Sequence, residues 1–371
     1  MNEHQDLGGE LLNFVERGIV AQLMELVHSE RVFTDLLIEE NEPVMAKGPL
    51  GWEPVASMKS TGREALAELL AKLDPDWENT IQSRAINRPV DLMEWRLRVN
   101  AYLAHGGAKL MMAIRKIPAR PIALKDTGLP ASARLMLDHP RGLVLIAGAT
   151  GSGKSTTLAA LLDAVNESRS AHVVTIEDPI EYRFERKKSI FSQREVGVDV
   201  ASLFEGVRDA MRQSPNVIAI GEVRDRDTAD AALLAAESGH LVIGTLHANS
   251  AAGAVQKLLG YFASTEREAR LATLAATLVG VVSQVLLPAA DAKGYALAAE
   301  MMFNHKRQFS RVLGEPEKIA TLLERKEDGV SRSMAEAMVE LVGAKRVTKL
   351  DVLRAAAAGQ AALYERLKSA A

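Results

Sequence analysis

The chain has 371 residues, 47% of them hydrophobic and 25% charged, which is enough apolar material for a folded core and suggests two domains. A net charge of −3 gives no overall attraction to nucleic acid or anionic lipid, and the lack of cysteine excludes disulfides and thiolate metal sites. The polar N-terminus lacks the pattern of a signal peptide and no apolar run approaches the ~18 residues that span a bilayer, so we expect a cytoplasmic protein without direct membrane insertion.

The first third of the chain mixes helical and extended patterns. Apolar residues at helical spacing predict one helix over 10–30 and a second over 61–78. Between them, 32–55 holds short apolar runs interrupted by proline and glycine, which favours strands and turns. Further strands are predicted at 94–103 and 108–117. This part of the chain is therefore expected to be an α+β domain.

A linker is predicted where three prolines and a glycine fall between Pro118 and Pro130. After it, nearly continuous apolar runs alternate with helical stretches, a pattern typical of a parallel sheet covered on both faces. The predicted strands are 143–147, 173–176, 217–220 and 241–246, and the predicted helices begin at 154, 202 and 227. Beyond residue 265 the chain is expected to be mostly helical. The predicted domains are 1–120, the linker 121–129, an α/β core over 130–290 and a C-terminal helical region over 291–371.

A glycine-rich loop follows the first strand of the parallel sheet and fits G-x-x-x-x-G-K-S between a strand and a helix, as a phosphate-binding loop requires. Its backbone N–H groups can surround an anion at the helix start, although a glycine turn without a ligand is the alternative. Lys154 can reach the β- and γ-phosphates of ATP, and Ser155 can offer its hydroxyl to Mg²⁺. The predicted nucleotide-binding residues are Gly148, Ala149, Thr150, Gly151, Ser152, Gly153, Lys154, Ser155 and Thr156.

Ionisable residues follow the other predicted strands, where ligands bind in an open parallel sheet. Glu222 is our candidate for the base that activates the attacking water. Because Gly221 stands where a metal-linked aspartate is usual, Glu177 is a candidate to hold Mg²⁺, with Glu222 as a further metal contact. His247 and His240 bracket one strand and are candidates for sensing the γ-phosphate. The alternatives are helix caps for the glutamates and structural roles for the histidines.

These motifs resemble the PilT-like branch of the secretion ATPase superfamily. The resemblance implies a PAS-like N-terminal domain followed by a RecA-like ATPase domain, assembled as a homo-hexamer that binds ATP and Mg²⁺. The segments similar to the family's motifs are Gly148–Thr157, Thr175–Tyr182, Asn216–Asp225 and Gly239–Asn249.

The resemblance also implies arginines that stabilise the γ-phosphate, some of them supplied by a neighbouring subunit. Arg208 and Arg212 are four residues apart and so share a helix face. The alternative for each is a solvated surface arginine. The full set of matching positions is Arg96, Arg98, Arg115, Arg194, Arg208 and Arg212.

The family drives type IV pilus movement or related export. The resemblance therefore implies a retraction or accessory motor for twitching motility, with an inner-membrane platform protein and possibly a second pilus ATPase as partners. Residues 306–315 do not keep the segment typical of retraction motors, so an accessory or secretion-linked role stays open. A conjugation-like secretion ATPase and a nucleotide-gated regulator with little turnover are the alternatives. A nucleic-acid motor is disfavoured by the net charge and the few aromatic residues.

Overall fold

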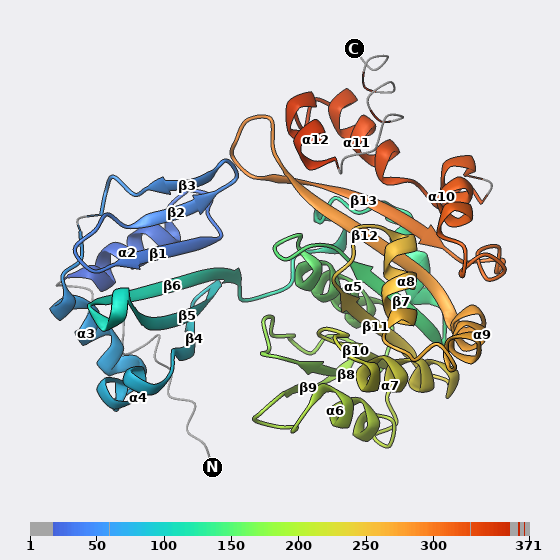
Figure 1. The fold of residues 1–371 in the computed structure, drawn as a ribbon, viewed down its shortest axis with the longest axis horizontal. Helices are drawn as coiled ribbons and strands as arrows, with labels where there is room; N and C mark the ends of the chain where they lie inside the picture. Colours follow the sequence, from blue (N-terminus) through green and yellow to red (C-terminus); the bar gives the residue numbers. More distant parts are fainter. Residues whose placement is uncertain (1–17, 59, 327, 357–362, 364–366, 368–371) are drawn as a thin grey trace. The chain divides into compact units, whose positions relative to one another are not determined.

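The computed structural model describes residues 18–356 apart from 59 and 327, together with 363 and 367. The chain divides into two compact units, Met1–Arg120 with Asp291–Gly294, and Pro121–Ala290 with Tyr295–Ala371. Each unit has its own sheet (Figure 1). The predicted helix over 10–30 is found as α2, Ile19–His28, and its first part lies outside the described residues.

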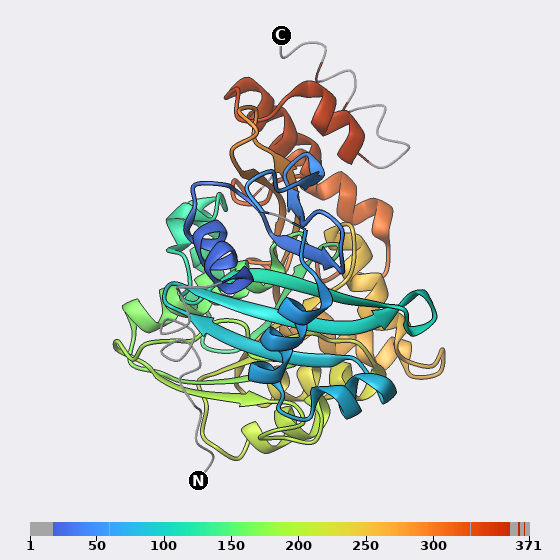
Figure 2. The ribbon, with the colours of Figure 1, turned by 90° about the vertical axis from the view of Figure 1, so that its left-hand side faces the viewer.

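The first unit is an antiparallel sheet with helices on one face (Figure 2). Side chains alternate between its faces, and the buried set packs with α2 and the following helices into one apolar core. The sheet order is β3-β2-β1-β6-β5-β4. The strands are β1 Asp35–Glu39, β2 Met45–Gly48, β3 Gly51–Pro54, β4 Ile86–Leu92, β5 Trp95–Ala104 and β6 Lys109–Pro118. The remaining helices are α3 Arg63–Leu73, α4 Trp77–Ser83 and the short η1 His105–Gly107.

The second unit is built on a mainly parallel sheet of seven strands within the described residues, in the order β13-β12-β7-β11-β10-β8-β9. The four predicted strands are confirmed at its centre as β7, β8, β10 and β11. The strands are β7 Gly142–Ala147, β8 His172–Glu177, β9 Ile190–Glu195, β10 Val217–Ile220, β11 Leu241–Leu246, β12 Leu278–Pro288 and β13 Tyr295–Phe303.

Successive residues of these strands point to opposite faces of the sheet. Both sets are buried, because helices cover both faces. On one face, Val144 and Ile146 pack against α5, Lys154–Ser168. On the other, Leu143 and Leu145 belong to a core with the helices that follow β9. The remaining elements are η2 Leu124–Asp126, η3 Ala131–Asp138, α6 Leu203–Ala210, α7 Arg226–Glu237, α8 Ala251–Gly260, α9 Arg267–Thr277, α10 Pro316–Arg325, α11 Met334–Gly343 and α12 Lys349–Ala355.

The expectation of a mostly helical chain beyond residue 265 is wrong for β12 and β13. These two long strands form an antiparallel hairpin, and β12 also pairs in parallel with β7, the strand before the glycine loop. The sheet therefore extends beyond the predicted core, and α11 and α12 pack against the far end of the hairpin (Figure 1).

Candidate active site

The glycine loop joins the buried strand β7 to α5, as predicted. Gly151 and Gly153 have φ of 79° and 86°, a left-handed conformation that glycine adopts without strain. Gly153 is also the N-cap of α5 and provides no side-chain cap. The N–H groups of the first helical turn, which have no partner within the helix, are therefore left to bind an anion.

Lys154 is the first residue of α5, and its side chain folds back onto the glycine loop. Its ammonium donates to the carbonyl oxygens of Gly148 and Ala149, both at 2.9 Å, and its Nζ is 3.5 Å from Nδ1 of His247. Burial lowers the pKa of Lys154, while the charges of Glu222 and Glu181 raise it. The ammonium is thus held by weak neutral acceptors that a phosphate can replace.

Gln284 on β12 contacts the glycine loop, although no motif in the sequence identifies it. Its side chain is buried, and its Nε2 donates to the carbonyl oxygen of Ser152 at 2.7 Å. A Cβ on Gly148 would lie 2.7 Å from the carbonyl oxygen of Gln284 and 2.2 Å from Ser152 Oγ, so only glycine fits this close approach. The wrong helical prediction for this segment concealed the contact.

Glu222 is held at the carboxyl edge of the sheet by its neighbours in the chain. Gly221 donates its N–H to the carbonyl of Ile176 on β8, and its own carbonyl accepts from Thr245 Oγ1 on β11. The N–H of Val223 donates to the carbonyl of Thr245. The backbone around Glu222 is therefore tied to both flanking strands.

The side chain of Glu222 is bound on both oxygens. Its Oε1 is 2.8 Å from Nε2 of His247, and its Oε2 accepts from Nε of Arg224 at 2.8 Å. Arg224 Nη1 also reaches Asp178 Oδ2 at 3.2 Å. The polar series Lys154–His247–Glu222–Arg224–Asp178 thus follows the order of the strands β7, β11, β10 and β8. The strand-end runs contain Arg224 and Asp178, but spacing alone does not reveal that they join Glu222.

His247 lies between Lys154 and Glu222, and its surroundings lower its pKa. Burial and the nearby charge of Lys154 lower its pKa, and Glu222 raises it. Because the ammonium of Lys154 can only donate, Nδ1 of His247 accepts and Nε2 carries the proton toward Glu222. The imidazole therefore connects the lysine of the loop with the candidate base.

Glu177 lies at the end of β8 and has hydrogen-bond partners of its own. Its Oε1 accepts from Thr175 Oγ1 at 2.6 Å and from Gln193 Nε2 at 3.2 Å. Burial raises the pKa of Glu177, and these hydrogen bonds together with the backbone of Glu181 lower it. Neither glutamate caps the helix that follows it, since α6 is capped by Ser202 and α7 by Asp225, whose side chain accepts from the N–H of Thr228.

His240 is not brought to this edge. It precedes β11, so it lies at the opposite end of the strand from His247. Six residues at about 3.3 Å each separate the two ends. The Nδ1 of His240 is 2.9 Å from the carbonyl oxygen of Pro215, which matches the structural alternative.

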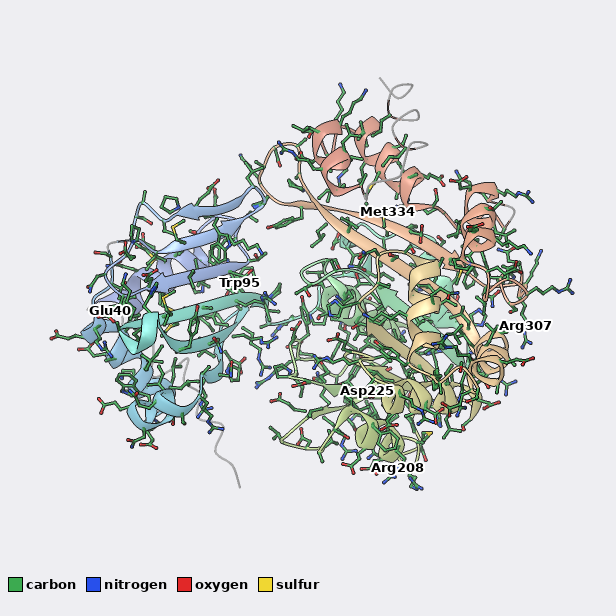
Figure 3. All side chains as sticks on the ribbon, in the orientation of Figure 1. Glu40, Trp95, Arg208, Asp225, Arg307 and Met334 are labelled. Carbon is green, nitrogen blue, oxygen red and sulfur yellow. The ribbon has the colours of Figure 1, made fainter. Side chains whose placement is uncertain are left out.

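Three of the predicted arginines gather around β9 and α6. Arg194 lies 3.9 Å from Asp209 Oδ2 and donates to the carbonyl of Asp199 at 3.2 Å. Arg208 is exposed on α6 (Figure 3). Arg212, just after the helix, is also exposed and donates to the carbonyl of Arg208 at 3.3 Å. Both Arg208 and Arg212 are therefore accessible on the surface, although Arg208 also lies over the ring of Phe204.

The other three arginines share one face of the sheet in the first unit. Arg96 and Arg98 alternate along β5, and Arg115 on β6 lies directly opposite Arg98. Arg115 pairs with Asp35 at 2.8 Å, and Arg96 lies 3.6 Å from Asp91. This face is opposite to the one that packs against the helices.

A magnesium ion fits the edge of the sheet by the chemistry of its oxygens. The hydroxyl of Ser155 is exposed at the start of α5, and Glu177 and Glu222 end neighbouring strands. Among the described residues, no three histidine or carboxylate side chains gather into a ready metal site. That suits Mg²⁺, which is usually bound by one or two protein oxygens, substrate phosphates and water.

The chain matches the family described as type II/IV secretion system protein over residues 46–347. It is 44% identical over 192 residues to the type IV pilus retraction ATPase PilT of Pseudomonas aeruginosa, covering 52% of this chain and 55% of that protein. It is 34% identical over 259 residues to the type IV pilus ATPase PilU of the same organism, covering 70% and 67%. The crystal structure of the pilus retraction motor PilT with bound ADP matches with a TM-score of 0.75 at 30% identity, covering 91% of this chain and 98% of that one.

The chain therefore belongs to the type II/IV secretion system protein family, and the predicted resemblance to its PilT-like branch is confirmed. The likeness to the PilT structure confirms the predicted fold, an N-terminal α+β domain followed by a RecA-like domain. By sequence the chain spans only 55% of the length of the first pilus relative. No helix in the described part of the chain is long and apolar enough to cross a bilayer.

Proposed function

We propose that this chain is an ATP-hydrolysing motor of type IV pilus dynamics, in a retraction or accessory role. The observation that carries the proposal is the series Lys154–His247–Glu222 at the carboxyl edge of the sheet. Two contacts link the phosphate-binding lysine to a carboxylate, one between Lys154 and His247 and one between His247 and Glu222. The pilus assignment rests on the similarity to PilT and PilU.

In this mechanism the N–H groups at the start of α5 and the ammonium of Lys154 bind the phosphates of ATP. Ser155, with Glu177 or Glu222, would hold Mg²⁺, which neutralises charge on the phosphates when it is bound. Glu222 accepts the proton of the attacking water. His247 keeps its proton on Nε2 and orients the carboxylate, so it also registers whether Lys154 is bound to a phosphate.

We further propose that the motor is a homo-hexamer whose arginines act across subunit boundaries. Arg194 on β9, Arg208 on α6 and Arg212 just after α6 would meet a neighbour's nucleotide, and the arginine face of the first unit would close on the nucleotide as the linker 121–129 bends. An inner-membrane platform protein would receive the force, with a second pilus ATPase as a further partner.

The test is ATP hydrolysis by the wild type and by Glu222→Gln, with the mass in solution measured alongside. The substitution keeps the shape of the side chain but removes the base, so we expect ATP binding to remain and kcat to fall about 10²–10⁴-fold. If both proteins bind ATP and neither hydrolyses it in any assembly state, the motor proposal fails. A nucleotide-gated regulator would then be the better account.

A further inference from the structure

Glu300 is a carboxylate buried inside the second unit, on β13, away from the phosphate loop. Its exposed fraction is 8%. Residues on either side of it face different cores, since Met302 packs with the helices around α8 and Ala298 packs with α11 and α12. Glu300 therefore lies at the boundary between the ATPase core and the C-terminal helices.

The partners of this carboxylate are two backbone N–H groups. Oε1 accepts from the N–H of Ala251 at 2.6 Å, and Oε2 accepts from the N–H of Met334 at 3.3 Å. Ala251 is the first residue of α8. Met334, which is labelled in Figure 3, is the first residue of α11. One side chain thus binds the N-termini of two helices at once.

No basic side chain forms an ion pair with Glu300 in the part of the chain that the structure describes. Burial raises its pKa, and the two N–H hydrogen bonds lower it. A buried charge without a counter-ion is costly, so the positive ends of the two helices must stabilise it. Separating either helix from Glu300 would remove part of that stabilisation.

The contact at α8 leads directly to the active site. His247 is separated from Ala251 by only three residues, the last of which, Ser250, caps α8 by accepting from the N–H of Gly253. Because this segment is so short, the position of the α8 N-terminus restricts where His247 lies relative to Glu222. A displacement of about 1 Å at such a group lowers a rate substantially.

We infer that Glu300 is a positioning residue that couples α11 to the segment carrying His247 through its two N–H contacts. A shift of α11, for example when the C-terminal helices meet a partner, changes the support of α8 and so the geometry of His247 and Glu222. The effect on turnover rests on the proposed function, whereas the coupling of the two helices does not.

The first experiment compares the full-length wild type with Glu300→Gln, in which one N–H faces an amide NH₂ instead of a carboxylate oxygen. We expect faster hydrogen exchange in peptides covering 247–256 and 333–342, with no change in 203–210. We also expect kcat for ATP to fall about tenfold or more while KM changes little, because the ground-state contacts to phosphate are untouched. Unchanged exchange and kcat would overturn the inference, and so would a uniform rise in exchange.

A second pair of variants leaves Glu300 in place. Met334→Pro removes the N–H at the first helical position, where proline is tolerated, and the preceding Ser333 already has the extended backbone that proline requires. Met334→Ala is the control, since it loses the same side chain but keeps the N–H. Coupling predicts faster exchange at 247–256 and lower kcat in Met334→Pro than in Met334→Ala. Equal behaviour of the two would overturn it.

The two claims fail in different ways. If the wild type does not hydrolyse ATP but Met334→Pro still raises exchange at 247–256 more than Met334→Ala does, the motor proposal fails and the coupling stands. If the wild type hydrolyses ATP and Met334→Pro changes exchange only in α11, the coupling fails and the motor proposal stands.

Discussion

Arg224 occupies the position between the candidate base and a second carboxylate. Its guanidinium donates to Glu222 at 2.8 Å and to Asp178 at 3.2 Å. These contacts restrict the orientation of the Glu222 carboxylate. These contacts raise the pKa of Arg224, with the hydrogen bond to Glu222 as the largest cause. The residue therefore holds the orientation of the candidate base through its contacts with two carboxylates.

We predict that Arg224→Ala lowers kcat about ten- to a hundredfold, because a misplaced base loses rate steeply, while ATP binding stays near wild type. Arg224→Lys should restore only part of the rate, since an ammonium lacks the planar fork that serves two carboxylates. The measurement is steady-state ATP hydrolysis together with equilibrium nucleotide binding.

Arg226→Ala is the matched control for this prediction. Arg226 carries the same charge two residues away but pairs with Glu266 and Asp227 on the surface. It should keep the wild-type rate. If Arg224→Ala and Arg226→Ala behave alike, Arg224 does not position the base.

The residues of the candidate site were predictable where a motif or a strand end identifies them. Lys154 belongs to a spaced motif, and Glu222 and His247 are the first ionisable side chains after buried strands. His240 was placed in the site by its type, although it lies at the other end of the same strand. The direction of the strand explains the error, because a parallel sheet brings only the carboxyl ends of its strands to the edge where the site lies. Gln284 was not predictable, because its role depends on pairing between β12 and β7.

At the scale of elements, the contact of α6 with the sheet depends on a small residue. A Cβ on Gly206 would lie 2.6 Å from Cγ2 of Ile176, which precedes Glu177 on β8. Ile176 belongs to the buried core, so its side chain cannot move away cheaply. Gly206 thus sets how closely the helix that bears Arg208 approaches the candidate site.

We predict that Gly206→Ala lowers the free energy of unfolding by about 1–3 kcal/mol, because the extra methyl overpacks the core. Gly343→Ala, in α11, meets nothing within 4 Å and should be neutral or stabilise by up to about 1 kcal/mol through helix propensity. Denaturant unfolding of both variants measures this. A Gly206→Ala protein as stable as Gly343→Ala would contradict the close packing of α6 on β8.

The central strands of the second unit follow from sequence because their apolar runs are short, continuous and separated by helical patterns. The hairpin β12–β13 does not. Its strand 295–303 is rich in alanine and methionine, which favour helices, and only pairing with a neighbouring strand makes it extended. The edge strand β9 escaped prediction because most of its residues are polar and half-exposed, so it lacks a buried pattern.

At the scale of the whole molecule, pH acts on stability through groups buried in the fold. The imidazole of His139 lies edge-on to the ring of Phe303, which stacks on His305. Burial, and then the charge of His305, lower the pKa of His139. The unfolded chain therefore binds a proton at a higher pH than the folded chain does.

We predict that the free energy of unfolding contributed by His139 is fully present above the unfolded pKa of about 6.5 and is lost as pH falls toward the lowered folded value. The carboxyl of Glu300 has a raised pKa and the opposite sign, losing stability as pH rises above about 4.5. The measurement is therefore the difference between wild type and His139→Gln from pH 5 to 8. A difference independent of pH would contradict the assignment.

Assembly gives the most direct test of which arginines serve a neighbour. If Arg208 acts on the nucleotide of a neighbouring subunit, Glu222→Gln and Arg208→Ala remove groups from opposite sides of the same subunit interface. A ring made of only one of these variants is then inactive. Random mixing then gives about a quarter of the interfaces an intact Glu222 on one side and an intact Arg208 on the other. The mixture should hydrolyse ATP faster than either variant alone, and its rate per subunit should rise with concentration until rings form. A rate equal to the mean of the two variants would place Arg208 within its own subunit's chemistry or outside the chemistry altogether.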